Sequence, residues 1–345
     1  MYSRGTILNT ASNAILVITA HNESRNIDSL IRQIGNLVDF IVVVDDGSQD
    51  GTAEIAKSAL ERDSHNFVVL THIKNTGQGG ARSTGALFAV NGRSSDENMF
   101  IHSQNGKPWE PTEDAVLIFT DGDGQLDPCE IPAFLKKLSN SPADFVKGDR
   151  FSTPDLLRVM PKTRLFGNVL LSAITKLSSG YWDLTDSQCG YFAMKLNLAA
   201  KLDWKKLRTG YGQINDIVIR LNELDARVSS VPIKAIYGIG EVSGIRVHKV
   251  ALPIFLTCLR GFYRRILIKN TIWKTHPLAA FYIMGHVLVF VSTVMATRIL
   301  FGMSNGIAAP PLTSILVMVL ATLGLLSIFQ AIFLDLVENR RLYVP

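Results

Sequence analysis

Short apolar runs alternate with amphipathic segments through the first half of the chain. Five runs rich in Val, Ile, Leu and Phe predict buried β-strands, at residues 14–20, 40–45, 67–72, 115–120 and 143–148. Between the first two runs, Ile27, Leu30, Ile31 and Ile34 follow a helical period. Strands that alternate with helices predict an α/β fold built on a mostly parallel, doubly wound sheet.

Residues 91–114 interrupt this rhythm. The stretch "NGRSSDENMFIHSQNGKPWEPTED" is polar, and connections of this length are uncommon inside a compact domain. We therefore predict a surface insertion here, within a soluble domain that spans residues 1–248.

Two long apolar segments lie near the C-terminus. Residues 278–301 and 312–334 each reach or exceed the roughly 20 residues that cross a bilayer as a helix. The loop between them, residues 302–311, is uncharged and rich in turn residues. The pattern predicts a two-helix transmembrane hairpin. A pair of buried core helices is the alternative, but the remaining chain is too small to enclose two uniformly apolar helices.

Basic residues gather on one side of the predicted hairpin. Residues 249–276 mix Leu, Ile, Phe and Trp with only positive charge, which is typical of amphipathic helices in the membrane interface. Arg340 and Arg341 follow the second span. The positive-inside rule therefore predicts that residues 1–248 and the tail, residues 335–345, are cytoplasmic. The membrane would be the inner membrane of a bacterium or the endoplasmic reticulum of a eukaryote. A protein-binding face is the alternative for the basic helices.

Composition excludes several classes of protein. The chain has 345 residues and a formal net charge of +5, and its basic excess lies beside the predicted spans rather than among aromatic residues. Anionic lipid is therefore a better partner than nucleic acid. Three widely spaced cysteines argue against a disulfide framework and a structural zinc site. No basic segment followed by an apolar core opens the chain, so we expect no cleavable signal.

Acidic residues follow three of the predicted strands. These are Glu23, the pair Asp45 and Asp46, and the pair Asp121 and Asp123. Because the carboxyl ends of parallel strands meet at one edge of a sheet, we expect these acids to share a site. Close carboxylates repel unless a cation lies between them, and a ligand set of oxygens favours Mg²⁺ or Mn²⁺. For Asp121 and Asp123 alone, a solvated Asp/Gly turn is the alternative.

Six short motifs occur in a characteristic order along the chain. They are "ITAHNES", "VVVDDGSQDGT", "NTGQGGARSTG", "FTDGDGQLDP", "KGDRF" and "TDSQCGYFAMK". In this order and spacing, over residues 13–250, they resemble family 2 glycosyltransferases with the GT-A fold. The chain is most similar to the polyprenyl-phosphate branch, which includes dolichyl-phosphate mannosyl- and glucosyltransferases. The resemblance implies a Rossmann-like sheet flanked by helices, followed by amphipathic juxtamembrane helices and the hairpin.

The resemblance also implies roles for the residues that carry the chemistry. Asp121 and Asp123, with Gln125 close by, would bind the metal and the sugar diphosphate. Arg150 would lie beside phosphates, and we expect Asp123, Arg150 and Asp216 to act in catalysis. Asp216 would hold sugar hydroxyls or assist the acceptor, with a helix cap or a surface position as the alternative.

A second group of residues is expected to bind the substrates. Asp46 would bind the base or ribose, with Asp45 and Glu23 beside it. Further contacts are expected from Ala20, Asn22, Gly79, Arg82, Gly122, Arg164, Asn168, Arg246 and Lys249. Arg246 stands where the family has a mobile basic acceptor loop, whereas Arg164 has an ordinary surface ion pair as its alternative.

Some positions depart from the family pattern. Thr19 and His21 stand where Pro and Tyr are usual, and Gly122 and Gly124 replace Ala and Leu. The carboxylates are unaffected, but the nucleotide preference stays open. Gly190 is expected to shape the fold rather than take part in the chemistry.

The predicted reaction is the inverting transfer of one sugar from a UDP- or GDP-sugar to a polyprenyl phosphate at the cytoplasmic membrane face. A phosphate oxygen is already anionic, so it needs no strong base. A membrane-bound enzyme of polysaccharide synthesis is an alternative, although no QxxRW sequence is present and two spans make a poor channel. A silent scaffold with the same fold is another. A nicotinamide-dependent enzyme is excluded because no GxGxxG follows the first strand. Homo-oligomerisation is left open.

Overall fold

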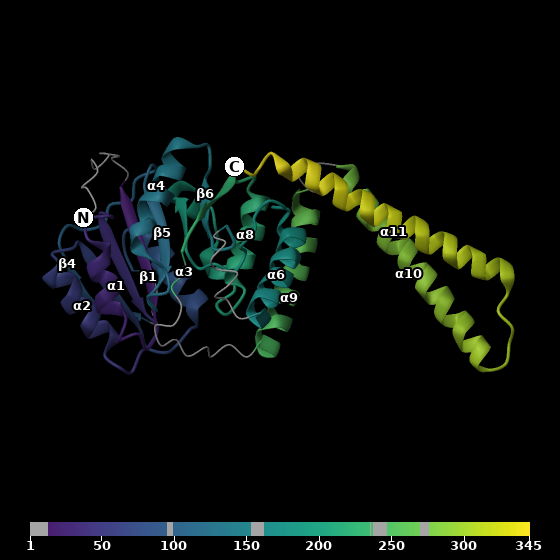
Figure 1. Cartoon of the computed structure of the whole chain (residues 1–345), viewed down its shortest axis with the longest axis horizontal. Helices are drawn as coiled ribbons and strands as arrows, with labels where there is room; N and C mark the ends of the chain where they lie inside the picture. Colours follow the sequence, from purple (N-terminus) through teal and green to yellow (C-terminus); the bar gives the residue numbers. More distant parts are fainter. Residues whose placement is uncertain (1–12, 95–98, 153–161, 235, 237–246, 270–275) are drawn as a thin grey trace.

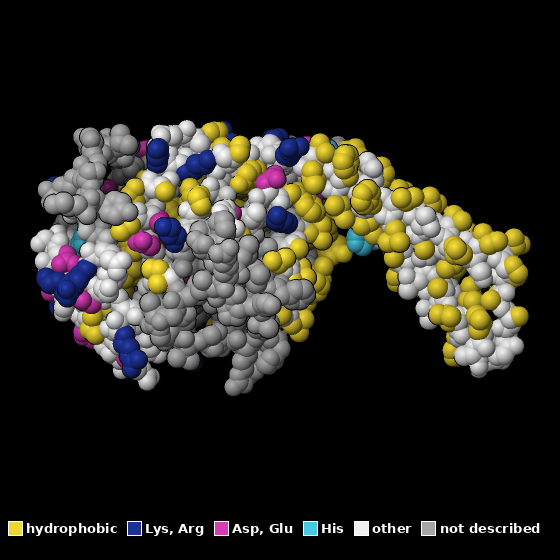
Figure 2. All heavy atoms as spheres, in the orientation of Figure 1, with side chains coloured by type: hydrophobic (Ala, Val, Ile, Leu, Met, Phe, Trp, Pro, Cys, Tyr) yellow, Lys and Arg dark blue, Asp and Glu magenta, His cyan; other side chains and the backbone are white. Residues whose placement is uncertain are grey.

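The computed structural model describes residues 13–94, 99–152, 162–234, 236, 247–269 and 276–345. Figure 1 shows an α/β domain that continues into two long antiparallel helices, which lean away from the domain. Charged side chains lie over the domain, whereas the visible face of the helical pair is mainly hydrophobic and uncharged (Figure 2). The surface of the domain therefore suits water, whereas the surface of the helical pair suits an apolar environment.

A mixed sheet forms the centre of the domain, with strand order β4-β3-β2-β1-β5-β7-β6-β8. The strands are β1 Ala14–Ala20, β2 Phe40–Asp45, β3 Phe67–His72, β4 Met99–Asn105, β5 Val116–Asp121, β6 Phe145–Asp149, β7 Phe192–Lys195 and β8 Val228–Pro232. Strands β3, β2, β1 and β5 are parallel, as are β6 and β8. Strands β4 and β7 run antiparallel to their neighbours. The predicted α/β sheet is confirmed.

Helices cover both faces of this sheet. They are α1 Ile27–Ile34, α2 Thr52–Arg62, α3 Gln78–Asn91, α4 Ile131–Asn140, α7 Leu196–Ala199 and α8 Gln213–Glu223, with short 3₁₀ turns η1 Pro128–Glu130 and η2 Trp204–Lys206. Helices α1, α2 and α4 supply one hydrophobic core, and α3, α7 and α8 supply the other. Because both faces are covered, the central strands are apolar on both sides, which explains their continuous apolar runs.

The predicted polar insertion contains an edge strand. Residues 99–105 form β4, which pairs antiparallel with β3. The segment between β4 and β5 is fixed to α3 by Trp109. Its side chain is buried, and its indole N–H donates to the carbonyl of Ala89 at 2.8 Å. The strand was not predicted because an edge strand carries mixed polar and apolar side chains and lacks the continuous apolar run of the central strands.

Two helices carry the predicted membrane spans, α10 Pro277–Ser304 and α11 Pro311–Arg340. Both are long and apolar enough to cross a membrane. They cross closely at two glycines. A Cβ added at Gly285 would lie 2.9 Å from the carbonyl oxygen of Gly324, and one added at Gly324 would lie 2.8 Å from Val289 Cγ2. Small residues that permit such close approach are a common interface between membrane helices.

We expect Gly324→Ala to destabilise the helical pair. The added methyl overlaps Val289, so the helices must separate, at a cost of about 1–3 kcal/mol. Gly302→Ala is the matched control, because the nearest heavy atom there is 3.8 Å away. Thermal unfolding of the detergent-solubilised chain should shift downward for Gly324→Ala alone. Equal shifts for both variants would contradict the close crossing.

The end of the chain returns to the sheet instead of forming a free tail. Helix α11 extends to Arg340, beyond the predicted end at 334. The N–H of Val228 in β8 then donates to the carbonyl of Leu342, and the N–H of Val344 donates to the carbonyl of Val228, both at 2.8 Å. Figure 1 shows the C-terminus beside the domain. The residues that follow α11 therefore attach the hairpin to the sheet.

Two further helices lie between the sheet and the hairpin. They are α6 Lys162–Ser179 and α9 Val247–Leu267, which pack side by side (Figure 1). Helix α9 begins two residues before the segment predicted to be amphipathic, residues 249–276, and covers its first part. Helix α6 was not expected at this position.

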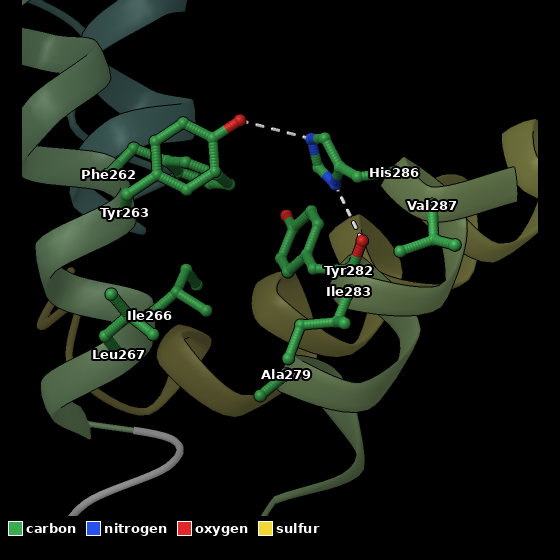
Figure 3. A pocket seen from close by; sticks show the side chains of 9 residues that line it. All are labelled: Phe262, Tyr263, Ile266, Leu267, Ala279, Tyr282, Ile283, His286 and Val287. Carbon is green, nitrogen blue, oxygen red and sulfur yellow. Dashed lines mark hydrogen bonds between the residues drawn. The ribbon is translucent and has the colours of Figure 1, made fainter. Parts of the chain in front are cut away.

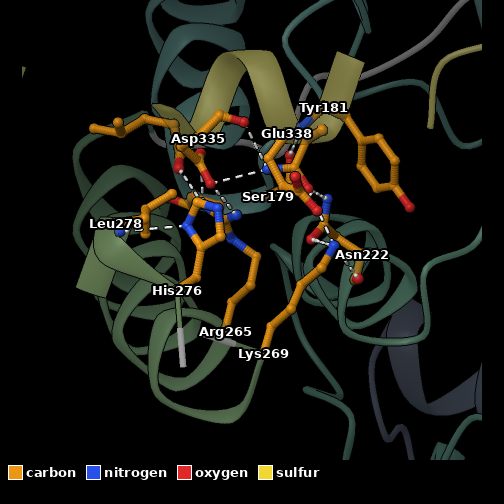
Figure 4. Close-up of polar contacts among 12 residues, drawn as sticks. Ser179, Tyr181, Asn222, Arg265, Lys269, His276, Leu278, Asp335 and Glu338 are labelled. Atoms are coloured by element: carbon orange, nitrogen blue, oxygen red, sulfur yellow. Dashed lines mark hydrogen bonds and ion pairs between the residues drawn. The ribbon is translucent and has the colours of Figure 1, made fainter. Parts of the chain in front are cut away.

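A buried polar network joins these helices to α11 (Figure 4). Arg265 of α9 donates to both carboxylate oxygens of Asp335, at 2.7 and 2.9 Å, and to the carbonyl of Ser178 at 2.9 Å. Lys269 and Asn222 both donate to the side-chain oxygen of Asn339, at 3.1 and 2.9 Å. The Arg265 and Asp335 side chains are fully buried. A buried charge requires such pairing, so this network fixes the hairpin on the domain.

Candidate active site

The predicted acids lie at the carboxyl ends of three adjacent strands. Strand β1 lies between β2 and β5, with Ala20 level with Asp45 and Thr19 level with Asp121. The loop after β1 contributes Glu23, whose pKa is raised by burial and by the nearby charges of Asp50 and Asp121, against a hydrogen bond from Asn26. The sheet thus places these carboxylates within electrostatic reach of each other.

Asp121 is held by groups from two neighbouring elements. Its Oδ1 accepts from Arg82 Nη2 of α3 at 2.8 Å and from Thr19 Oγ1 of β1 at 3.2 Å. Arg82 is buried, with its Nε lacking a hydrogen-bond partner in the described part of the chain. Backbone at Gly190 approaches the other carboxylate oxygen so closely that a Cβ there would lie 2.5 Å from it. Arg82 therefore orients Asp121 directly.

The turn after β5 presents Asp123 and Gln125. The backbone N–H of Gln125 donates to Asp123 Oδ1 at 3.0 Å. Gly124 has φ 74°, a conformation that favours glycine. Gly122 packs on Ala20, where an added Cβ would lie 3.0 Å from the Ala20 methyl. The glycines that replace Ala and Leu thus permit a tight turn with two carboxylates.

Asp45 and Asp46 have different surroundings. Burial favours a higher pKa for Asp46, but hydrogen bonds from His72 and Thr76 outweigh it, so its pKa is lowered. Its oxygens accept from His72 Nδ1 at 2.7 Å and from the N–H groups of Thr76 and Gly77, each at 2.8 Å. Asp45 accepts from Ser48, and burial raises its pKa. Asp46 thus binds the backbone of the loop before α3. Its sequence motif did not indicate this role.

The loops after β1 and β2 are tied together through Asn22. Its N–H donates to Ser48 Oγ at 2.8 Å, and its side-chain oxygen accepts from the N–H of Gln49 at 3.0 Å. Asn22 has φ 57°, a left-handed conformation that Asn tolerates. Asn22 therefore holds the loop after β1 against the loop after β2.

Buried cations lie on the strand beside β7. Arg150, at the end of β6, donates to Asp186 through Nε at 2.6 Å and Nη2 at 3.0 Å. Lys147 is fully buried and donates to the carbonyl of Cys189, and burial lowers its pKa to about 8. Lys147 and Asp186 were missed from the sequence, although a lysine in an otherwise apolar strand is a detectable signal. Both support the loop that carries Gly190.

Asp216 lies in the first turn of α8 and faces α9. Its Oδ1 accepts from Arg220 Nε at 3.2 Å and from Arg264 Nη2 at 3.3 Å. The first residue of α8 contacts α3, since Gln213 Nε2 donates to the carbonyl of Gly79 at 2.5 Å. Asp216 thus joins α8, the helix beside the site, to α9.

Other predicted contacts fall outside this cluster. Arg246 lies outside the described residues, and Arg164 and Lys249 lie in α6 and α9 with side chains that are not described. Asn168 lies in the first half of α6 and is half-buried. The structure therefore brings together the residues at the strand ends and leaves the predicted lipid-phosphate contacts untested.

The donor set fits a divalent cation that is shared with substrate. Among the described residues, no group of three His, Cys, Asp or Glu side chains is arranged to hold a metal. Mg²⁺ is typically bound through one or two carboxylates together with substrate phosphates, rather than in a cage of protein ligands. Asp121 and Asp123 supply that number, so the residues fit such an ion.

An apolar pocket lies between α9 and α10 (Figure 3). It has a volume of about 260 Å³ and is lined by residues such as Phe262, Ile266 and Val287. The Tyr263 hydroxyl lies 3.2 Å from His286 Nε2. The lining suits an apolar chain rather than a nucleotide.

The fold and the acidic strand ends define an α/β protein with a candidate ligand site at the carboxyl ends of its parallel strands. The glycosyl transferase family 2 model matches residues 15–92. A UDP-N-acetylglucosamine–dolichyl-phosphate N-acetylglucosaminyltransferase from Methanococcus voltae is 29% identical over 266 residues, which cover 74% of this chain and 95% of that protein. An uncharacterized protein from Methanocaldococcus jannaschii is 30% identical, over 64% of this chain and 81% of its own length.

A solved structure shares the fold. The crystal structure of glucosyl-3-phosphoglycerate synthase from Mycobacterium tuberculosis, in complex with Mn²⁺ and UDP, matches with a TM-score of 0.50 at 17% identity. The match covers 73% of this chain and 81% of that one. The chain belongs to glycosyl transferase family 2 and is a glycosyltransferase.

We expect Gly190→Ala to impair turnover without unfolding the domain. Its methyl would displace the carboxylate of Asp121 and would lie 3.0 Å from Arg82 Nη2. A misplacement of about 1 Å at a reacting centre can cost about 100-fold in rate. Gly210→Ala is the matched control, because no heavy atom lies within 4 Å of its added Cβ. Sugar transfer and melting temperature should be measured for both; equal activity of the two variants would contradict this arrangement.

Proposed function

We propose that the chain transfers one sugar from a nucleoside diphosphate sugar to a polyprenyl phosphate, with inversion, at the cytoplasmic face of a membrane that α10 and α11 span. One observation carries the proposal: the domain with paired carboxylates at Asp121 and Asp123 is fixed by buried polar contacts to α11, one of two antiparallel helices of membrane-spanning length. The dolichyl-phosphate relative supports the acceptor class.

The protein's own groups suit such a reaction. Arg82 and Thr19 hold Asp121 in place before any ligand arrives, so little reorganisation is needed. A divalent cation, when bound by Asp121 and Asp123, supplies charge neutralisation for the diphosphate leaving group. Arg150 makes two hydrogen bonds to Asp186, which neutralise its charge, so we propose that it positions the loop that carries Asp186 and Gly190 beside the site.

The acceptor requires a site beside the membrane rather than a strong base. A phosphate oxygen attacks as an anion, so proton removal is not limiting near neutral pH. The apolar pocket between α9 and α10 suits part of an isoprenoid chain. Exposed Arg260 on α9 and Arg341 after α11 favour a cytoplasmic orientation.

The test is transfer of radiolabelled sugar into organic-extractable lipid. Detergent-solubilised chain is incubated with polyprenyl phosphate, Mg²⁺ or Mn²⁺, and a panel of UDP- and GDP-sugars. We expect one donor to label the lipid and EDTA to abolish the labelling. Nucleotide binding without labelling would overturn the polyprenyl acceptor, and loss of both binding and labelling would favour a silent scaffold.

A further inference from the structure

The segment that follows β8 lies against the turn that carries Asp123. The backbone N–H of Ile236 donates to the carbonyl of Gln125 at 2.9 Å. The N–H of the same Gln125 donates to Asp123 Oδ1 at 3.0 Å. Gln125 therefore connects the segment after β8, through two hydrogen bonds, to a carboxylate that fits the shared cation.

The turn that carries Asp123 needs support from outside itself. Residues 122–125 follow the end of β5 and belong to neither a strand nor a helix. Gly124 has φ 74° and no side chain that could hold it in place. Because no ladder of backbone hydrogen bonds fixes such a turn, its geometry depends on individual contacts, and the N–H of Ile236 supplies one of them.

Glu130 holds the segment after β8 in this place. Strand β8 ends at Pro232, and the N–H of Ile233 still donates to the carbonyl of Asp149 in β6 at 3.1 Å. The next N–H, that of Lys234, donates to Glu130 Oε1 at 2.7 Å. Glu130 is the last residue of η1, so its side chain bridges the loop after β5 and the chain beyond the sheet.

An ordinary structural role does not account for Glu130. It is the N-cap residue of α4, yet its side chain makes no capping hydrogen bond. Its Oε2 is buried and finds no hydrogen-bond partner within the ranges that the structure describes. Burial raises the pKa of Glu130 to about 7, and Asp127 adds to the rise, against the N–H and the charge of Lys234. The fold thus disfavours the ionised carboxylate that it keeps, and such groups are enriched at functional sites.

We propose that Glu130 is a positioning residue for sugar transfer, which holds the segment after β8 against Gln125 and thereby fixes the turn that carries Asp123. Glu130 acts through the backbone of Lys234 and Ile236 and touches no reacting atom. Its effect on turnover rests on the proposed function, in which Asp123 binds the cation. Its effect on the backbone does not, so hydrogen exchange tests the inference without any turnover.

The experiment compares Glu130→Ala with Glu130→Gln in the detergent-solubilised full chain. The alanine variant removes the acceptor for the N–H of Lys234, whereas the glutamine variant keeps an acceptor oxygen there. We expect Glu130→Ala to lower kcat about tenfold, since small misplacements at a reacting centre are costly, and to raise the Mn²⁺ concentration that gives half-maximal rate. Amide hydrogen exchange at Lys234 and Ile236 should become faster. Glu130→Gln should restore all three, and Glu113→Ala, at an exposed position, is the control.

The melting temperature at pH 8 separates positioning from general stability. Because burial raises the pKa of Glu130, the ionised side chain destabilises the fold at this pH, and its removal offsets the lost hydrogen bond. Glu130→Ala should therefore melt close to the wild type. A large fall in melting temperature, unchanged exchange at Ile236, or a glutamine variant as impaired as the alanine variant would overturn the inference. A wild-type chain that transfers no sugar would instead refute the proposed function, and exchange at Ile236 would still decide the role of Glu130.

Discussion

Asp123→Ala is expected to reduce sugar transfer by about 1,000-fold or more, with the melting temperature nearly unchanged. The lost carboxylate is one of two that fit a shared cation, and such charge stabilisation contributes several kcal/mol to the transition state. Each 1.36 kcal/mol corresponds to tenfold in rate, so about 4 kcal/mol gives this loss. The fold should survive because Asp123 lies in a half-exposed turn, with the adjacent N–H of Gln125 as a local partner.

Asp114→Ala is the matched control for this variant. Asp114 is exposed and precedes β5, at the end of the strand opposite Asp123. Its loss should leave transfer within about twofold, since surface substitutions rarely exceed ±0.5 kcal/mol. EDTA should reduce wild-type activity as strongly as Asp123→Ala does. Retention of more than a tenth of wild-type activity by the variant would disprove the metal role.

Arg265→Ala is expected to destabilise the protein by about 3–5 kcal/mol. The substitution leaves the Asp335 carboxylate buried without its bidentate partner, and it also removes the donors to the carbonyls of Ser178 and Leu177. The free energy of unfolding in detergent should fall accordingly. Because Arg265 joins α9 to α11, protease cleavage near the start of α10 should also become faster.

Two variants test whether burial causes this effect. Arg341 forms an exposed pair with Glu338 at 3.2 Å, so Arg341→Ala should cost less than about 1 kcal/mol. Replacement of both partners, Arg265→Met with Asp335→Leu, should recover much of the stability, because an apolar pair leaves no buried charge. If Arg265→Ala lowered the free energy of unfolding by no more than Arg341→Ala does, the buried network would not hold the hairpin on the domain.

Several site residues could be predicted because their positions depend on strand order alone. Asp45 and Asp121 follow apolar runs that pair in parallel with β1, so their convergence required only the α/β rule. Their partners could not be predicted in this way. Arg82 meets Asp121 because α3 packs across β1, and this contact joins residues 39 positions apart.

Other features were concealed by local sequence. Residues 342–344 are too few to give a strand pattern, and only their pairing with Val228 reveals their place. Lys147 and Asp186 are charged residues in a buried region, which pattern reasoning assigns to the surface. Burial of each is compensated by a partner that is distant in the chain.

The sequence by itself determined the alternation of strands and helices, the acids at the strand ends and the two long apolar helices, because these depend on periodicity and length over neighbouring residues. The tertiary structure alone decided which face of α6 points outward, which partners hold Asp121 and Asp46, and how α11 is joined to the domain. Those features arise from contacts between distant segments, where burial makes each polar group find a partner. No local pattern encodes that pairing.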